Sequence, residues 1–78
     1  MKSFLVESYT PRSAVLGEIE ARARHASDGT GVQYVRSIFV RRDEICFHLL
    51  DGPSAADVGE VMRASGIGAQ RIVEVDDA

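Results

Sequence analysis

The chain has 78 residues, of which 45% are hydrophobic and 27% are charged, and this composition is that of one small globular domain. The net charge of −3 and the pI near 5.2 exclude a basic surface for phosphate backbones, so we expect no nucleic-acid partner. Cys46 is the only cysteine, which excludes an internal disulfide and a thiolate zinc cage built from one chain. The sequence lacks the apolar run of a signal peptide or a membrane span, so we expect a cytoplasmic protein without a membrane partner. A core of this size contributes little net stability, and oligomerisation is therefore expected.

The first third of the chain predicts a strand followed by a helix. Residues 2–9 alternate between apolar and polar types, as in a strand with one buried face. Thr10 and Pro11 then have the residue types of a helix start, with Thr10 as the N-cap and Pro11 at the first helical position. In residues 12–27 apolar side chains recur every three or four positions, which predicts an amphipathic helix. Its end is predicted at residues 27–31, SDGTG, which are typical of a turn.

Residues 34–54, YVRSIFVRRDEICFHLLDGPS, predict a β-hairpin with a tight turn at Arg42 and Asp43. Arg41 would then face Glu44 across the hairpin as an opposite-charge pair. Counting outward gives the opposed pairs Val40 and Ile45, Phe39 and Cys46, Ile38 and Phe47, Ser37 and His48, and Arg36 and Leu49. Because side chains alternate, one hairpin face is apolar, with Ile38, Val40, Ile45, Phe47 and Leu49. The other face carries Val35, Ser37, Phe39, Cys46, His48 and Leu50, and we expect the functional groups there.

The last third of the chain predicts a second helix and a final strand. Ser54 with Asp57 three residues later resembles a capping box, and this places a negative charge near the helix N-terminus. Val58, Val61 and Met62 form the apolar stripe of this helix. Gly66 fits the left-handed position that follows a helix end. Residues 70–75 predict the fourth strand, in which Val73 and Val75 share one face and Ile72 and Glu74 share the other.

The order strand, helix, strand, strand, helix, strand predicts a ferredoxin-like α+β sandwich. We expect residues 1–78 to form one such domain, with a four-stranded antiparallel sheet of order 4-1-3-2 and both helices on one face. The apolar hairpin face is assigned to the helix side, with Arg36 at its edge. The predicted helix-side core is Phe4, Val6, Ile45, Phe47, Leu49, Val73 and Val75. The remaining face would meet a second copy of the chain, through Leu5, Val35, Phe39, Leu50 and Ile72.

Three segments carry a resemblance to a known family: FLVESYTP at residues 4–11, RSIFVRRDEICFHLLDGPSAADV at residues 36–58, and RIVEV at residues 71–75. Together they resemble the small bacterial family called domain of unknown function 4242. The resemblance implies a ferredoxin-like fold that usually dimerises through the open sheet face, with no established enzymatic activity. Part of that family is described as nickel-binding, so the resemblance also implies nickel as a cofactor. It assigns no ligand residues to this chain.

Four polar residues are predicted to converge on the open face. Glu7 lies on the first strand, Cys46 and His48 on the third, and Glu74 on the fourth. Imidazole, thiol and carboxylate groups in a partly apolar cavity suit a divalent transition metal or a proton transfer. Each residue also has a structural alternative: His48 as a hydrogen-bonded group at the dimer interface, Cys46 as a small apolar side chain, Glu7 as a paired carboxylate, and Glu74 as a solvated one. His25 most simply interacts with the dipole of the first helix.

Three classes of function stay open at this point. The first is a non-catalytic homodimer that encloses a divalent metal, such as nickel, or a small hydrophobic ligand, with Glu7 and His48 as the main polar contacts. The second is a cofactor-free dimeric α+β barrel enzyme, similar to an oxygenase or an isomerase, with His48 as the base and Glu7 orienting it. The third is a structural or interaction subunit without a ligand.

Overall fold

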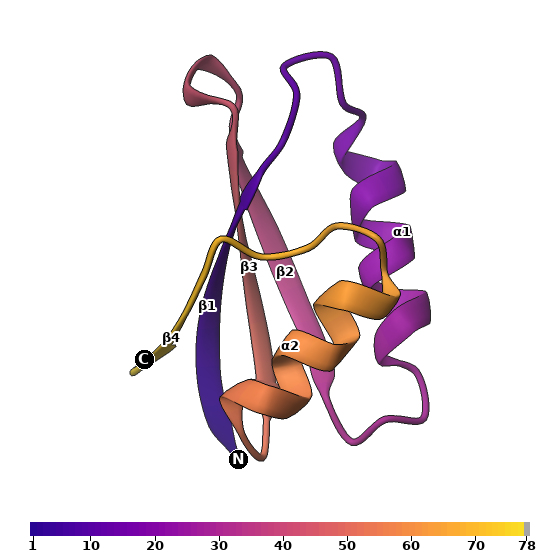
Figure 1. Ribbon diagram of the computed structural model, residues 1–78, viewed down its shortest axis with the longest axis vertical. Coiled ribbons are helices and arrows are strands. Elements are labelled where there is room, and N and C mark those ends of the chain that lie inside the picture. The colour runs from indigo at the N-terminus through magenta and orange to yellow at the C-terminus, as the bar shows by residue number, and fades with distance from the viewer. Residues whose placement is uncertain (78) are drawn as a thin grey trace.

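The computed structural model describes residues 1–77, in which a four-stranded sheet and two helices form two layers (Figure 1). The elements in chain order are β1 (Lys2–Tyr9), α1 (Leu16–Ser27), β2 (Gln33–Val40), the 3-10 turn η1 (Arg41–Asp43), β3 (Ile45–Gly52), α2 (Ala55–Ala64) and β4 (Arg71–Val75). The antiparallel strands have the order β2-β3-β1-β4, and both helices cover one face (Figure 1). This is the predicted ferredoxin-like order read from the opposite edge. Within the described residues, no helix is long and apolar enough to cross a membrane.

The predicted hairpin register is confirmed, but the contacts at its turn differ from those predicted. All five opposed pairs from Val40 with Ile45 to Arg36 with Leu49 are present, and a β-bulge lies between Tyr34 and Arg36. The turn is the 3-10 segment η1 followed by Glu44 in the left-handed conformation, with φ of 55°. Instead of facing Glu44, the Arg41 guanidinium donates to the carbonyl oxygens of Arg12 and Ala14, at 2.6 and 3.0 Å.

These contacts also explain why α1 begins at Leu16 and not near Arg12. The Glu44 carboxylate accepts a hydrogen bond from the backbone N–H of Arg12 at 2.9 Å. The Arg41 guanidinium occupies carbonyls of the same segment, so these backbone groups bond to the hairpin turn and not to a helix. Thr10 is therefore not an N-cap. Its hydroxyl donates to the carbonyl oxygen of Ser8 at 3.3 Å.

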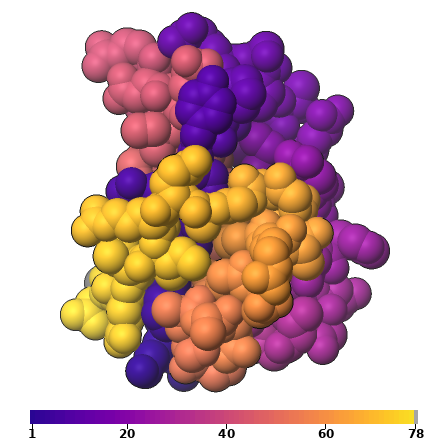
Figure 2. All heavy atoms as spheres, in the orientation of Figure 1, coloured from indigo at the N-terminus to yellow at the C-terminus, as the bar shows by residue number. Residues whose placement is uncertain are grey.

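The second helix and the turn after it follow the prediction. The Ser54 hydroxyl accepts a hydrogen bond from the backbone N–H of Asp57 at 3.2 Å, which caps α2. Val58, Val61 and Met62 are buried and join the core between the helices and the sheet. Gly66 has φ of +78°, the left-handed conformation expected after the helix. In the space-filling view, α2 and the segment that leads to β4 form a continuous surface (Figure 2).

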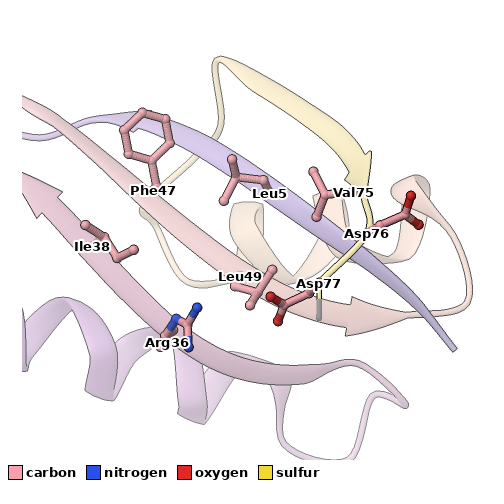
Figure 3. A pocket seen from close by; sticks show the side chains of 8 residues that line it. All are labelled: Leu5, Arg36, Ile38, Phe47, Leu49, Val75, Asp76 and Asp77. Atoms are coloured by element: carbon pink, nitrogen blue, oxygen red, sulfur yellow. The ribbon is translucent and has the colours of Figure 1, made fainter.

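The assignment of the hairpin to the two sheet faces was wrong. Directly paired residues share a face, and β1 pairs Val6 with His48, Phe4 with Leu50 and Leu5 with Leu49. Phe4 and Val6 pack beneath the helices as predicted, but Leu50, Cys46 and His48 accompany them there. The apolar hairpin face is the uncovered one (Figure 3). The residues predicted for the helix side that lie on the open face are Ile38, Val40, Ile45, Phe47, Leu49, Val73, Val75 and Arg36.

The predicted dimer face changes for the same reason. Of its members, Leu5 lies on the open face, where it lines a pocket. Leu50 is fully buried on the helix side, and Ile72 packs against the same core. Phe39 pairs with Cys46 and is therefore also on the helix side. Val35 lies at the β-bulge and has no partner in the ladder, so the pairing assigns it to neither face.

Candidate functional site

The four predicted site residues do not converge. Glu7 pairs with Phe47 and lies on the open face, where its carboxylate is 3.6 Å from the Arg71 guanidinium. Cys46 and His48 lie beneath the helices on the opposite side of the sheet. Glu74 is exposed on the edge strand β4, 3.9 Å from the Lys2 ammonium group. In residues 1–77, no three His, Cys, Asp or Glu side chains gather closely enough to hold a metal ion.

His48 belongs to a buried hydrogen-bonded chain on the helix-covered face. Its Nδ1 lies 2.6 Å from the Ser37 hydroxyl, which lies 2.5 Å from the hydroxyl of Tyr34. The Arg24 guanidinium of α1 lies over the Tyr34 ring, 5.0 Å from its centroid. The Nε2 atom of His48 is buried and has no hydrogen-bond partner within the described residues. The hairpin register predicted from the sequence already placed Ser37 opposite His48, and the structure confirms this pair. The contact of Tyr34 with Ser37 was not predicted.

Burial sets the protonation of this cluster. Desolvation lowers the pKa of His48 from 6.5 to about 4, so the imidazole is neutral near pH 7. Burial, with a smaller contribution from the Glu20 carboxylate, raises the pKa of the Cys46 thiol. Burial also raises the pKa of Tyr34. Because His48 and Cys46 are fully buried, a substrate on the open face reaches neither of them. The arrangement in which Glu7 orients His48 as a catalytic base is therefore wrong.

A pocket of about 170 Å³ lies on the open face instead (Figure 3). Its apolar lining comes from all four strands of the sheet and consists of Leu5, Ile38, Phe47, Leu49 and Val75. Arg36, Asp76 and Asp77 also line the pocket, and the Asp77 carboxylate lies beside Leu49 (Figure 3). The sequence analysis missed these three charged residues as site residues. The apolar hairpin face with Arg36 at its edge indicated such a site, but the sequence analysis assigned that face to the helices.

The open face leaves several apolar side chains in contact with water. Ile38, in the middle of β2, is 56% exposed. On the same face, its partner Phe47 on β3 and Val73 and Val75 on β4 are only partly buried. A contiguous apolar patch on one side of a sheet is characteristic of an interaction surface. Chemically, the pocket on this face offers apolar contact together with one guanidinium and two carboxylates.

Comparisons with known proteins agree with this fold. The crystal structure of SCO4226 from Streptomyces coelicolor A3(2) has a TM-score of 0.87 to this chain, at 19% sequence identity, and the similarity covers 97% of this chain and 98% of that one. At this identity the likeness shows the fold alone. A search of the curated proteins finds no match to this chain.

The family comparison covers most of the sequence. The model of the family described as "Nickel responsive protein SCO4226-like" matches residues 4–75. This agrees with the inferred resemblance in fold and in the connection with nickel, whereas the domain-of-unknown-function 4242 designation itself stays a prediction. The match shows that this chain belongs to the SCO4226-like family of nickel responsive proteins.

Proposed function

We propose that this protein is a non-catalytic binding protein that works as a homodimer, joined through its open sheet faces around a pocket for a small ligand. The observation that carries the proposal is the apolar open face, with Ile38 at 56% exposure. Covering this face with a second copy removes its side chains from water, which is the main favourable term in association. A core of this size also gains stability from a partner. The pocket over Leu5, Phe47 and Leu49 would then lie between the two sheets.

Sedimentation velocity over a wide range of concentration tests the dimer, and Ile38→Asp is the variant. A buried, unpaired carboxylate at the interface disfavours association, so we expect a dimer for the wild-type protein and a monomer for the variant. The matched control is Val15→Asp, because Val15 is 57% exposed outside the sheet. We expect this control to remain dimeric. A monomeric wild-type protein, or equal loss of the dimer in both variants, would contradict the proposal.

Native mass spectrometry tests the ligand. The mass of protein purified without a histidine tag is measured under native and under denaturing conditions. We expect the native dimer to exceed the mass of two chains by the mass of the bound ligand. A native dimer whose mass equals two chains would instead support the third class of function, an interaction subunit without a ligand.

Nickel binding is the second candidate, and membership of a nickel responsive family supports it. The four residues expected to ligate a metal do not fit one site, because the sheet separates Glu7 from His48 and Cys46. No other group of three suitable side chains gathers within residues 1–77 of one chain. We therefore assign nickel no ligand residues. A nickel site would require donors from more than one copy.

Thermal unfolding with added nickel tests this candidate, because a ligand that binds only the folded state raises the melting temperature. We expect nickel, but not magnesium, to raise the melting temperature of the wild-type dimer and to leave monomeric Ile38→Asp unchanged. His48→Asn should respond like the wild type because the His48 ring is fully buried. An equal nickel response in Ile38→Asp would contradict a site shared between copies.

A further inference from the structure

The charged side chains of the open face differ in whether the chain itself satisfies them. Glu7 lies 3.6 Å from Arg71, and the Asp51 carboxylate accepts a hydrogen bond from the Ser3 hydroxyl at 2.7 Å. The charged residues that line the pocket form no ion pair within 4.0 Å among residues 1–77, and they are Arg36, Asp76 and Asp77. The pocket therefore presents charges of both signs that are free to bind a ligand.

Two of these charged groups flank the same apolar side chain. Arg36 pairs with Leu49 in the β2–β3 ladder, so it lies next to Leu49 on the open face. The Asp77 carboxylate lies beside Leu49 as well (Figure 3). The nitrogen atoms of Arg36 and the carboxylate oxygens of Asp77 are nevertheless more than 4.0 Å apart. A ligand that lies over Leu49 would thus meet a guanidinium and a carboxylate that do not bond to each other.

The lining of the pocket asks for three chemical features in one ligand. A guanidinium binds a carboxylate through several N–H groups at once, and a carboxylate accepts charge-assisted hydrogen bonds from an ammonium group. The apolar floor, with Leu5, Phe47 and Leu49, favours contact with an aliphatic chain. A free α-amino acid with an aliphatic side chain has all three features, and both of its charged groups are attached to one carbon atom.

The size of the pocket agrees with such a ligand. Its volume of about 170 Å³ is below the range of roughly 300–1,000 Å³ that is typical of sites for drug-sized molecules. A single amino acid is a correspondingly smaller molecule. In the proposed homodimer the second sheet would cover the pocket, and the ion pairs to the ligand would be stronger there because less water screens them.

Resting on the proposed homodimer, we infer that the small ligand of this pocket is a free α-amino acid with an aliphatic side chain. Arg36 binds its carboxylate, and Asp77 binds its ammonium group. The aliphatic side chain of the ligand lies on the apolar floor over Leu5 and Phe47. Asp76 adds a second negative charge to the lining, which favours a ligand that carries an ammonium group over a simple carboxylic acid.

L-leucine is the probe, and an NMR titration of the isotope-labelled full chain measures its dissociation constant and locates its site. We expect the amide signals of β2 and β3 near Arg36 and Leu49 to shift, with micromolar to millimolar affinity because so small a ligand makes few contacts. Isopentylamine keeps the aliphatic chain but lacks the carboxylate, and isocaproate lacks the ammonium group. We expect each analogue to bind about tenfold more weakly than leucine, or weaker still.

Two variants show which side chain binds which charge of the ligand. Arg36→Gln should weaken leucine binding about tenfold or more and leave the binding of isopentylamine unchanged. Asp77→Asn should weaken leucine binding to a similar extent and leave the binding of isocaproate unchanged. Both side chains are exposed, so we expect both variants to fold, and their NMR spectra check this. The matched controls, Arg42→Gln and Asp43→Asn at the exposed hairpin turn, should bind leucine like the wild type.

Sedimentation velocity measures dimerisation separately from the titration. A dimeric wild-type protein whose pocket signals do not respond to leucine would overturn the amino-acid ligand and leave the homodimer standing. Equal affinity for leucine and isocaproate, or equal losses in Arg36→Gln and Arg42→Gln, would also overturn it. A monomeric wild-type protein would overturn the proposed homodimer, and leucine binding that depends on Arg36 and Asp77 would then assign the same ligand to the pocket of a single chain.

Discussion

The hydroxyl oxygen of Ser37 lies 2.6 Å from Nδ1 of His48, and the same oxygen lies 2.5 Å from the hydroxyl of Tyr34. One small side chain therefore satisfies two polar groups beneath the helices. Tyr34 is 5% exposed and His48 is fully buried, so water does not readily replace the hydroxyl.

Removing the Ser37 hydroxyl should destabilise the protein more than removing the Tyr34 hydroxyl. In Ser37→Ala, both Tyr34 and His48 lose a partner, and we expect the free energy of unfolding to fall by about 2 kcal/mol. In Tyr34→Phe, Ser37 still bonds to His48, and we expect a loss of about 1 kcal/mol. Urea unfolding of both variants at neutral pH measures the difference. Equal losses would indicate that the two bonds do not share Ser37 in solution.

His48 should make stability depend on pH in mildly acidic solution. Burial lowers its pKa in the folded state from 6.5 to about 4. Between these values the unfolded chain binds more protons than the folded protein does. The neutral His48 therefore costs no stability well above pH 6.5, and the free energy of unfolding decreases as the pH falls from 6.5 towards 4. From pH 7 to pH 5 we expect a loss of about 2 kcal/mol from this group.

Urea unfolding at a series of pH values measures this dependence, with His48→Asn as the comparison. The asparagine has no group that titrates in this range, so the slope should flatten even though the variant is less stable overall. His25 stays present in both proteins and is exposed. An unchanged slope in His48→Asn would show that other groups cause the pH dependence.

Cys46 should be unreactive in the folded protein. It is fully buried, and burial raises the pKa of its thiol, so neither access nor the thiolate form favours reaction. We expect an aromatic disulfide reagent at pH 8 to label the native protein far more slowly than the urea-unfolded protein. The rate of absorbance increase measures this labelling. Rapid stoichiometric labelling without urea would place Cys46 on an accessible surface and contradict the observed side of the sheet.

Ser54 should stabilise α2 through its cap. Its hydroxyl accepts the Asp57 N–H at 3.2 Å, so Ser54→Ala should lower the free energy of unfolding by about 1 kcal/mol. The control is Ser13→Ala, because Ser13 is exposed outside α1 and should change stability by less than about 0.5 kcal/mol. Thermal or urea unfolding compares the two. The same loss in both variants would argue against a specific capping effect.

Local features of the fold could be predicted from the sequence because residues that are close together in the chain determine them. The spacing of apolar residues located the strands and helices, and Ser54 marked the start of α2. The hairpin register followed from counting around a short turn. The start of α1 could not be predicted, because Arg41 and Glu44, which are about 30 residues away in the sequence, bind the backbone near Arg12.

The sequence by itself determined the order of the elements, the ferredoxin-like topology and the two faces of the hairpin. Only the tertiary structure decided which face the helices cover, because this depends on whether Val6 or Glu7 of β1 pairs with His48. A shift of one residue in that long-range pairing moves every side chain of the hairpin to the other side of the sheet. The observed pairing buries the imidazole and the thiol, and it leaves the apolar face with Ile38 and Phe47 open.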